Sequence, residues 1–84
     1  WLIEGSTPIE DIKHALEIEE LPDEENYETL AGFMMYSLRK IPRPADSVEY
    51  LGFKFEVVDV DHFKIDQLLV TRLVTQAQNA LDQE

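Results

Sequence analysis

Three carboxylates in the second half of the chain are the residues best suited to chemistry. Asp59 and Asp61 stand two positions apart in an alternating stretch, so a strand would point both side chains to one face. Asp66 follows the next predicted turn and can approach them. Because Ca²⁺ and Mg²⁺ take oxygen ligands, the sequence predicts a divalent-cation site at Asp59, Asp61 and Asp66. The alternative is a polar strand edge that faces water.

A second candidate site is an interaction surface around the middle of the chain. Met35 and Tyr36 adjoin an apolar helical stripe, so one of them is expected to be an exposed anchor for a partner or for a homodimer. The alternative is that these side chains are exposed only because the core of a small domain cannot accommodate every apolar residue. Arg39 and Arg43, with Lys40, form the one local basic cluster, which suits an acidic partner or a phosphate. The alternative is that these three cations only complement the dipole at the end of a predicted helix and otherwise face solvent.

The net charge of −11 on 84 residues narrows the classes of partner. Residues 1–30 contain ten acidic side chains and a single basic one, Lys13. A nucleic-acid partner is excluded because its phosphates would meet a repelling surface, and an anionic membrane is disfavoured for the same reason. The acidic run from Glu17 to Glu28 suits a cation or a basic partner, and a solvated loop is the alternative.

Several motifs of enzymes and cofactor sites are missing from the chain. It has no cysteine, no G-x-S-x-G elbow and no glycine-rich phosphate loop, and its two histidines lack metal-ligand spacing. The longest unbroken apolar run has four residues, so we expect no direct membrane insertion of this segment. The sequence therefore predicts a protein that is not an enzyme. Trp1 in place of a methionine suggests a piece of a longer protein.

Two helices are predicted in the first half of the chain. Thr7 and Glu10 form a capping-box pattern with Pro8 at the first helical position, which predicts a helix that ends before Leu21. A second helix is expected to start between residues 26 and 29 and to run to about Lys40. Its core-facing stripe comprises Leu30, Phe33, Met34, Leu38 and Ile41.

Strands are predicted at the start of the chain and throughout its second half. Residues 1–4 read as a strand, and residues 48–50 and 53–60 as a hairpin around a Leu51-Gly52 turn. The alternation shifts after Val57, which predicts either a bulge near Val57-Val58 or burial of both faces of the strand. A turn over 61–64 then leads into a strand over 65–74. We expect an α+β domain over 1–74, with two helices on a small mixed or antiparallel sheet of about four strands that ends in a β-meander. Residues 75–84 are predicted to be a polar tail or a short helix.

The ordered combination of these pieces resembles a known family, the CorC/HlyC transporter-associated domain. The resemblance covers about residues 1–73. The matching pieces are Trp1 to Ile9, Tyr27 to Gly32, Arg39 to Pro42, Gly52 to Asp61, and Ile65 to Leu73. One departure is Ala45, which stands where many members have glycine before the acid at Asp46.

The resemblance implies a non-catalytic accessory domain that regulates a bacterial hemolysin-like or magnesium and cobalt efflux protein. Its implied partners are the CBS domains and the membrane domain of that parent, at the cytoplasmic face of the inner membrane. The family's fold is grouped with FAD-binding domains, so FAD or an adenine nucleotide is a further alternative that rests on fold analogy alone. The family has no motif of catalytic residues to carry over. The candidate cofactors are therefore the Mg²⁺ or Ca²⁺ that the three carboxylates suggest, and FAD by fold analogy only.

Overall fold

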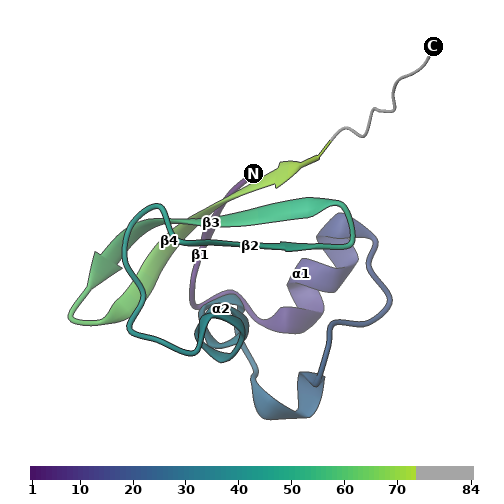
Figure 1. Cartoon of the computed structure of the whole chain (residues 1–84). Helices are drawn as coiled ribbons and strands as arrows, with labels where there is room; N and C mark the ends of the chain where they lie inside the picture. The colour runs from purple at the N-terminus through teal and green to yellow at the C-terminus, as the bar shows by residue number, and fades with distance from the viewer. Residues whose placement is uncertain (74–84) are drawn as a thin grey trace.

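The computed structural model describes residues 1–73, which form two helices, a 3₁₀ turn and four strands (Figure 1). The predicted tail or helix over 75–84 lies outside the described residues. The elements in chain order are β1 (Leu2–Glu4), α1 (Ile9–Leu16), the 3₁₀ helix η1 (Glu24–Asn26), α2 (Leu30–Leu38), β2 (Ser47–Tyr50), β3 (Phe53–Asp61) and β4 (Lys64–Arg72).

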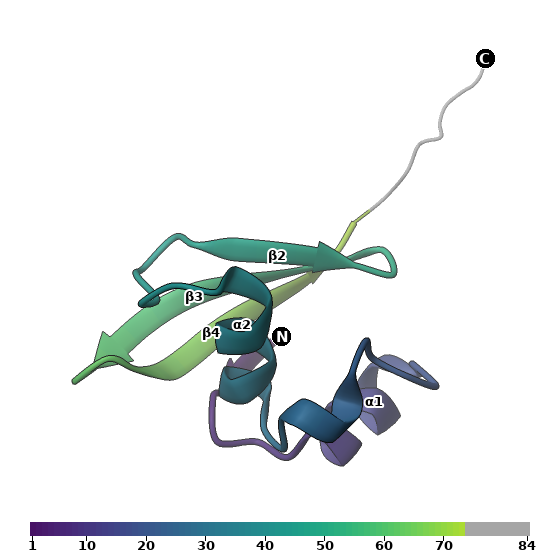
Figure 2. The same ribbon diagram turned by 60° about the horizontal axis from the view of Figure 1, so that its bottom comes forward.

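The four strands form one antiparallel sheet in the order β1-β4-β3-β2. The N-terminal strand completes the sheet by pairing with β4, with Leu2 opposite Leu69. Both helices lie against the same face of the sheet, as Figures 1 and 2 show from two directions. The α+β class and the two-helix, four-strand arrangement are therefore confirmed, and the sheet is antiparallel rather than mixed.

Both hairpins turn in two residues with positive φ. Leu51 and Gly52 have φ of 51° and 82°, which confirms the predicted turn between β2 and β3. His62 and Phe63, with φ of 51° and 67°, make the turn between β3 and β4. Two positive values in succession match the right-handed twist of the flanking strands, so each turn holds its hairpin in register.

The predicted capping box at the first helix is wrong. Pro8 occupies the N-cap position of α1, and no side chain caps this end. The reason is a tertiary one, because Pro8 forms a β-bridge with Thr29 and the carbonyl of Thr7 accepts from the N–H of Leu30 at 2.9 Å. The entry to α1 is thus held by the entry to α2, and the N–H of Ile9 is satisfied by Glu28 O, also at 2.9 Å.

The second helix starts as predicted and ends earlier. Thr29 is its N-cap, and its Oγ1 accepts from the N–H of Gly32 at 3.1 Å. The helix stops at Leu38 because Arg39 adopts the left-handed conformation, with φ of 56°. Ile41 therefore lies beyond the helix and is 62% exposed, so its predicted place in the core-facing stripe is wrong.

The core lies between the helices and the covered face of the sheet. Phe33 of α2 meets Phe55 of β3 edge to face, with ring centroids 5.3 Å apart. Ile12 of α1 and Leu68 of β4 are buried beside them. Burying each such side chain contributes roughly 1.5–3 kcal/mol, so this layer fixes both helices on the sheet.

Candidate functional site

The three predicted metal-ligating carboxylates are only partly brought together. Asp61 and Asp66 line one groove of about 500 Å³, between the β3–β4 turn and the first half of α2, and Asp59 is not among its lining residues. Asp59 lies opposite Gln67 in the β3–β4 pairing, where the register shifts on both sides of it. This irregularity confirms the predicted bulge.

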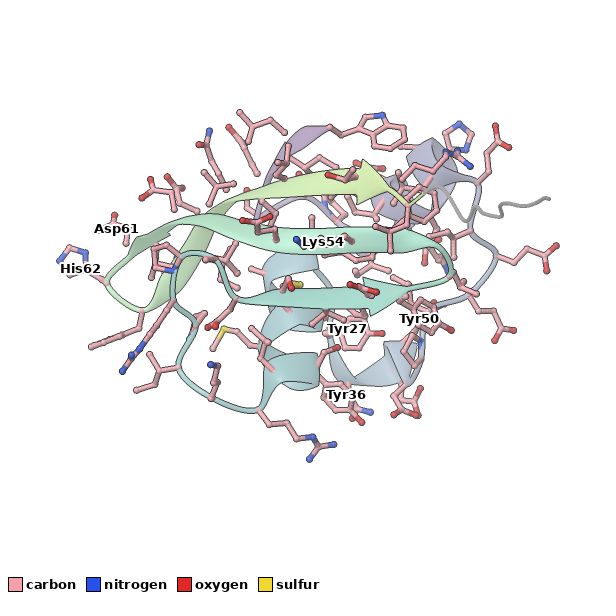
Figure 3. The ribbon with its side chains drawn as sticks, turned by 45° about the horizontal axis from the view of Figure 1, so that its top comes forward. Tyr27, Tyr36, Tyr50, Lys54, Asp61 and His62 are labelled. Carbon is pink, nitrogen blue, oxygen red and sulfur yellow. The ribbon has the colours of Figure 1, made fainter. Side chains whose placement is uncertain are left out.

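No three acidic or histidine side chains among residues 1–73 are grouped closely enough to hold a metal ion. Asp61 instead contacts its neighbour, with Oδ1 lying 2.7 Å from His62 Nδ1 (Figure 3). Lys64 lines the same groove as Asp61 and Asp66, so a cation there would have to share it with an ammonium group. The metal site at these three residues stays a prediction.

Met35 is the predicted interaction residue that lies in this same groove. Met35 is 44% exposed, and Ala31 and Ile65 also line the groove. The groove therefore combines carboxylates with apolar side chains in its lining. We refer to it below as the Asp61–Asp66 groove.

Tyr36 is half-buried and makes its polar contact within its own chain (Figure 3). Its hydroxyl donates to Asp23 Oδ2 at 2.8 Å, and its ring lies 5.5 Å from that of Tyr27. The bond to Asp23 raises the pKa of the Tyr36 hydroxyl. Burial, with the nearby charges of Glu24 and Asp23, raises the pKa of Tyr27 to about 12. Both rings are therefore neutral at physiological pH and serve to join α2 to the acidic connector.

The predicted basic cluster is divided between two places. The guanidinium of Arg39 sits over the ring of Tyr36, 5.2 Å from its centroid. Lys40 and Arg43 belong instead to the loop between α2 and β2. With Ile41, Pro42, Pro44, Val60, His62 and Phe63 they line an open groove of about 770 Å³.

Asp46 holds the loop that forms one wall of this second groove. Its Oδ2 accepts from the backbone N–H of Arg43 at 2.9 Å, and its Oδ1 lies 3.1 Å from Lys40 Nζ. These two contacts, with that to Lys40 the larger, hold the pKa of the Asp46 carboxyl below its usual value. The carboxylate is thus ionised wherever the domain is folded near neutral pH.

The acidic connector contains one internal ion-pair centre. Lys13 Nζ lies 2.7 Å from Glu24 Oε1 and 3.3 Å from Glu10 Oε2, and Glu24 Oε2 accepts from the N–H of Leu21 at 2.6 Å. The hydrogen bond between the two side chains raises the pKa of Lys13 and lowers that of Glu24. This centre fastens the connector to α1, so Glu24 acts structurally.

Reasoning from the sequence missed Phe63 and Ile41 as candidate binding residues. Both are strongly exposed, at 70% and 62%, and both line the second groove. A signal for Phe63 was present, since a large apolar side chain at the centre of a two-residue turn cannot reach the core. Among the described residues, no helix is long and apolar enough to cross a membrane.

The open antiparallel sheet with two helices on one face defines the class of the protein as a small α+β domain. The sequence profile of the CorC/HlyC family, described as "Transporter associated domain", matches residues 1–74. The chain belongs to this family.

Solved structures and a curated relative agree with this assignment. A CorC/HlyC domain from Haemophilus ducreyi is 53% identical, covers 89% of each chain and superposes with a TM-score of 0.82. The CorC/HlyC domain of a Xylella fastidiosa hemolysin, solved in complex with Mg²⁺ and Mn²⁺, is 37% identical with a TM-score of 0.76, over 87% of this chain and 86% of that one. The polyamine export protein of Escherichia coli K12 is 58% identical over 77 residues, which are 92% of this chain. The chain spans 17% of the length of that relative.

Proposed function

We propose that this domain is a non-catalytic accessory module of a bacterial export protein, and that it modulates transport by docking onto other domains of its parent. The identity to the polyamine export protein, over a small share of that protein's length, is the observation that carries this proposal. A parent of that kind would export polyamines from the cytoplasm, with this domain at the cytoplasmic face of the membrane. The CBS and membrane domains are the partners that the family resemblance suggests.

The architecture supports docking over chemistry. The pKa shifts found among the described residues accompany internal contacts, at Lys13, Glu24, Tyr27, Tyr36 and Asp46. These groups hold loops and helices in place, whereas a catalytic acid or base is tuned within a cleft that receives a substrate. Two of the strongly exposed apolar side chains, Ile41 and Phe63, line one groove together with Lys40 and Arg43, and such a combination is typical of a binding surface.

The test of this function is polyamine efflux by the parent with and without the domain. Cells loaded with labelled putrescine would express the full parent or the parent lacking residues 1–74, with the amount in the membrane measured for both. We expect efflux per molecule to change when the domain is removed. Equal efflux per molecule would contradict a modulating role.

A second candidate function is binding of a divalent cation, which the Xylella relative with Mg²⁺ and Mn²⁺ favours. Only Asp61 and Asp66 share a groove, and Ca²⁺ takes six to eight oxygen ligands, whereas Mg²⁺ keeps several waters and needs one or two carboxylates. The residues present therefore fit Mg²⁺ better than Ca²⁺. An FAD or nucleotide site rests on fold kinship alone and has no observation to favour it here.

Calorimetry of the domain with MgCl₂ tests this second candidate. The Asp61→Asn and Asp66→Asn variants should lose any heat of binding that the natural chain gives. Asp59→Asn is the matched control, because it removes the same charge outside the groove and should bind as the natural chain does. No heat at millimolar Mg²⁺, or equal loss in all three variants, would contradict a site in the Asp61–Asp66 groove.

A further inference from the structure

The groove between the α2–β2 loop and the β3–β4 turn is flanked by two exposed apolar side chains. Ile41 and Phe63 come from segments far apart in the sequence, and both line the same hollow of about 770 Å³. Pro42 and Pro44 of the loop and Val60 of β3 complete its apolar walls. We call this surface, with Lys40, Arg43 and His62, the Ile41–Phe63 groove. A hollow with apolar walls and large exposed side chains on both rims is suited to receive an apolar side chain.

The loop that forms one wall is held in shape before any partner arrives. Asp46 caps the N–H of Arg43, and its own N–H donates to Arg43 O at 3.1 Å. The last two residues of this turn are bonded to β3, because Ala45 N donates to Val57 O and Val57 N donates to Asp46 O, both at 2.8 Å. A preformed wall loses little conformational entropy on binding, so this surface is prepared for docking.

The charge of the groove differs from that of the rest of the chain. Its lining contains Lys40, Arg43 and His62 and no acidic residue, on a protein with a net charge of −11. Lys40 already pairs with Asp46, and His62 contacts Asp61. The Arg43 guanidinium makes no ion pair with any other residue of the described part, 1–73. Arg43 is therefore the cation that remains for an incoming carboxylate, which it can bind through two parallel N–H···O bonds.

We propose that the Ile41–Phe63 groove docks a segment of another domain of the parent, one that places an apolar side chain between Ile41 and Phe63 and a carboxylate on Arg43. This rests on the proposed accessory function and names the surface through which it operates. Arg43 matches the carboxylate of such a segment, and the apolar walls of the groove match its apolar side chain. A lipid surface is a poorer match, because the site is concave and the chain as a whole is strongly acidic.

A second copy of the chain is also a poorer match. The acidic connector could supply carboxylates to the groove, but its large apolar residues Ile18 and Leu21 are buried in its own core. It thus offers charge without an exposed apolar anchor. The acidic connector of a second copy is therefore a poorer match than a segment of another domain, which can carry both features together.

Hydroxyl-radical footprinting of the full-length parent and of this domain alone tests the proposal. We expect Phe63 to lose most of its reactivity in the parent, whereas Leu51, at the opposite end of the sheet, keeps its own. In a parent that carries Arg43→Glu, Phe63 should regain the reactivity of the isolated domain, because the incoming carboxylate would then meet a like charge. Lys54→Glu, on the uncovered face of the sheet, makes the same change of charge and should leave Phe63 protected.

Each other result overturns a definite part of the proposal. Protection elsewhere on the domain without protection of Phe63 would reject the groove and leave the docking function standing. No protection anywhere would reject both. Protection of Phe63 that survives Arg43→Glu would reject the carboxylate. Protection of the isolated domain that grows with its own concentration would assign the groove to a second copy, and protection by phosphatidylglycerol vesicles alone would assign it to lipid.

Discussion

The carboxylate of Asp46 accepts a hydrogen bond from the backbone N–H of Arg43 at 2.9 Å, and this bond closes the loop between α2 and β2. Oδ1 of the same carboxylate lies 3.1 Å from Lys40 Nζ, so one acidic side chain both fixes the loop and forms an ion pair with Lys40. Arg43 is exposed, and among residues 1–73 its guanidinium forms no ion pair. The loop thus combines a fixed backbone with a single cation available to a partner.

The stability given by Asp46 should depend on pH. Its folded-state pKa is lowered by Lys40 and by the N–H of Arg43, so its contribution is present above the unfolded pKa, about 4, and is lost as the pH falls through the lower folded value. The natural chain should therefore be more stable than Asp46→Asn at pH 7, and the difference should shrink toward zero in acid. Urea denaturation at several pH values measures this.

Lys40→Met supplies the control for that pH dependence. It removes the larger cause of the pKa shift and keeps the backbone bond to Arg43, so the natural chain's pH dependence should become shallower without disappearing. A difference in the free energy of unfolding between the natural chain and Asp46→Asn that stays constant from pH 7 to pH 2 would contradict stabilisation of the loop by the ionised Asp46 carboxylate.

Replacing Ala45 by glycine should stabilise the domain. Ala45 has φ of 78°, a left-handed conformation that costs a residue with a Cβ about 1–2 kcal/mol, while glycine costs about 0.4–1 kcal/mol in unfolded-chain entropy. A net gain of about 0.5–1 kcal/mol follows, and the urea midpoint should rise with an unchanged m-value. Ala31→Gly, the same change inside α2, should instead destabilise by about 1 kcal/mol or more. A fall in the midpoint for Ala45→Gly would show that its backbone is unstrained.

Gly5 should not tolerate a methyl group. A Cβ built there would lie 2.1 Å from Ile65 O and 3.1 Å from the Cβ of Ala31, where β1, β4 and α2 meet. The backbone of Gly5 also donates to Asp66 O and accepts from Ala31 N, at 2.9 and 2.8 Å, so it cannot withdraw without breaking these bonds. Gly5→Ala should lower the free energy of unfolding by about 1–3 kcal/mol.

Gly52→Ala is the informative comparison for Gly5. An added Cβ at Gly52 meets nothing within 4 Å, and the cost there comes only from its φ of 82°. Thermal unfolding should show a lower melting temperature for both variants. Only Gly5→Ala should also loosen the packing where β1, β4 and α2 meet, which faster hydrogen exchange at the amide of Ala31 would reveal. Unchanged exchange at Ala31 would contradict close packing at Gly5.

Local chemistry was enough to predict some elements from the sequence. The Leu51-Gly52 turn, the N-cap region of α2 and the slip in alternation near Val57 depend on neighbours in the chain, and the structure has all three. The capping box at Thr7 failed because the backbone of Thr7 bonds to Leu30, a partner that local spacing does not reveal. Periodicity likewise placed Ile41 in the core-facing stripe of a helix that was expected to run to about Lys40, whereas the left-handed Arg39 ends the helix at Leu38.

The candidate site was harder to predict because it depends on how distant segments meet. Alternation grouped Asp59 with Asp61, but the groove is formed by Asp61 and Asp66 together with α2. Tyr36 was predicted as a candidate exposed anchor from its residue type and its place beside the apolar stripe, yet its hydroxyl donates to Asp23. The exposure of Phe63 could have been inferred from its predicted turn, but that Phe63 and Ile41 line one groove follows only from the structure.

The most direct test of the proposed account is putrescine efflux by the parent that carries Arg43→Glu, measured per molecule in the membrane beside Lys54→Glu. We predict that Arg43→Glu changes the efflux rate toward that of the parent without the domain, because a docked domain is needed for modulation. Lys54→Glu should match the natural parent. Identical efflux by both variants, in a parent whose rate does respond to removal of residues 1–74, would contradict docking through the Ile41–Phe63 groove.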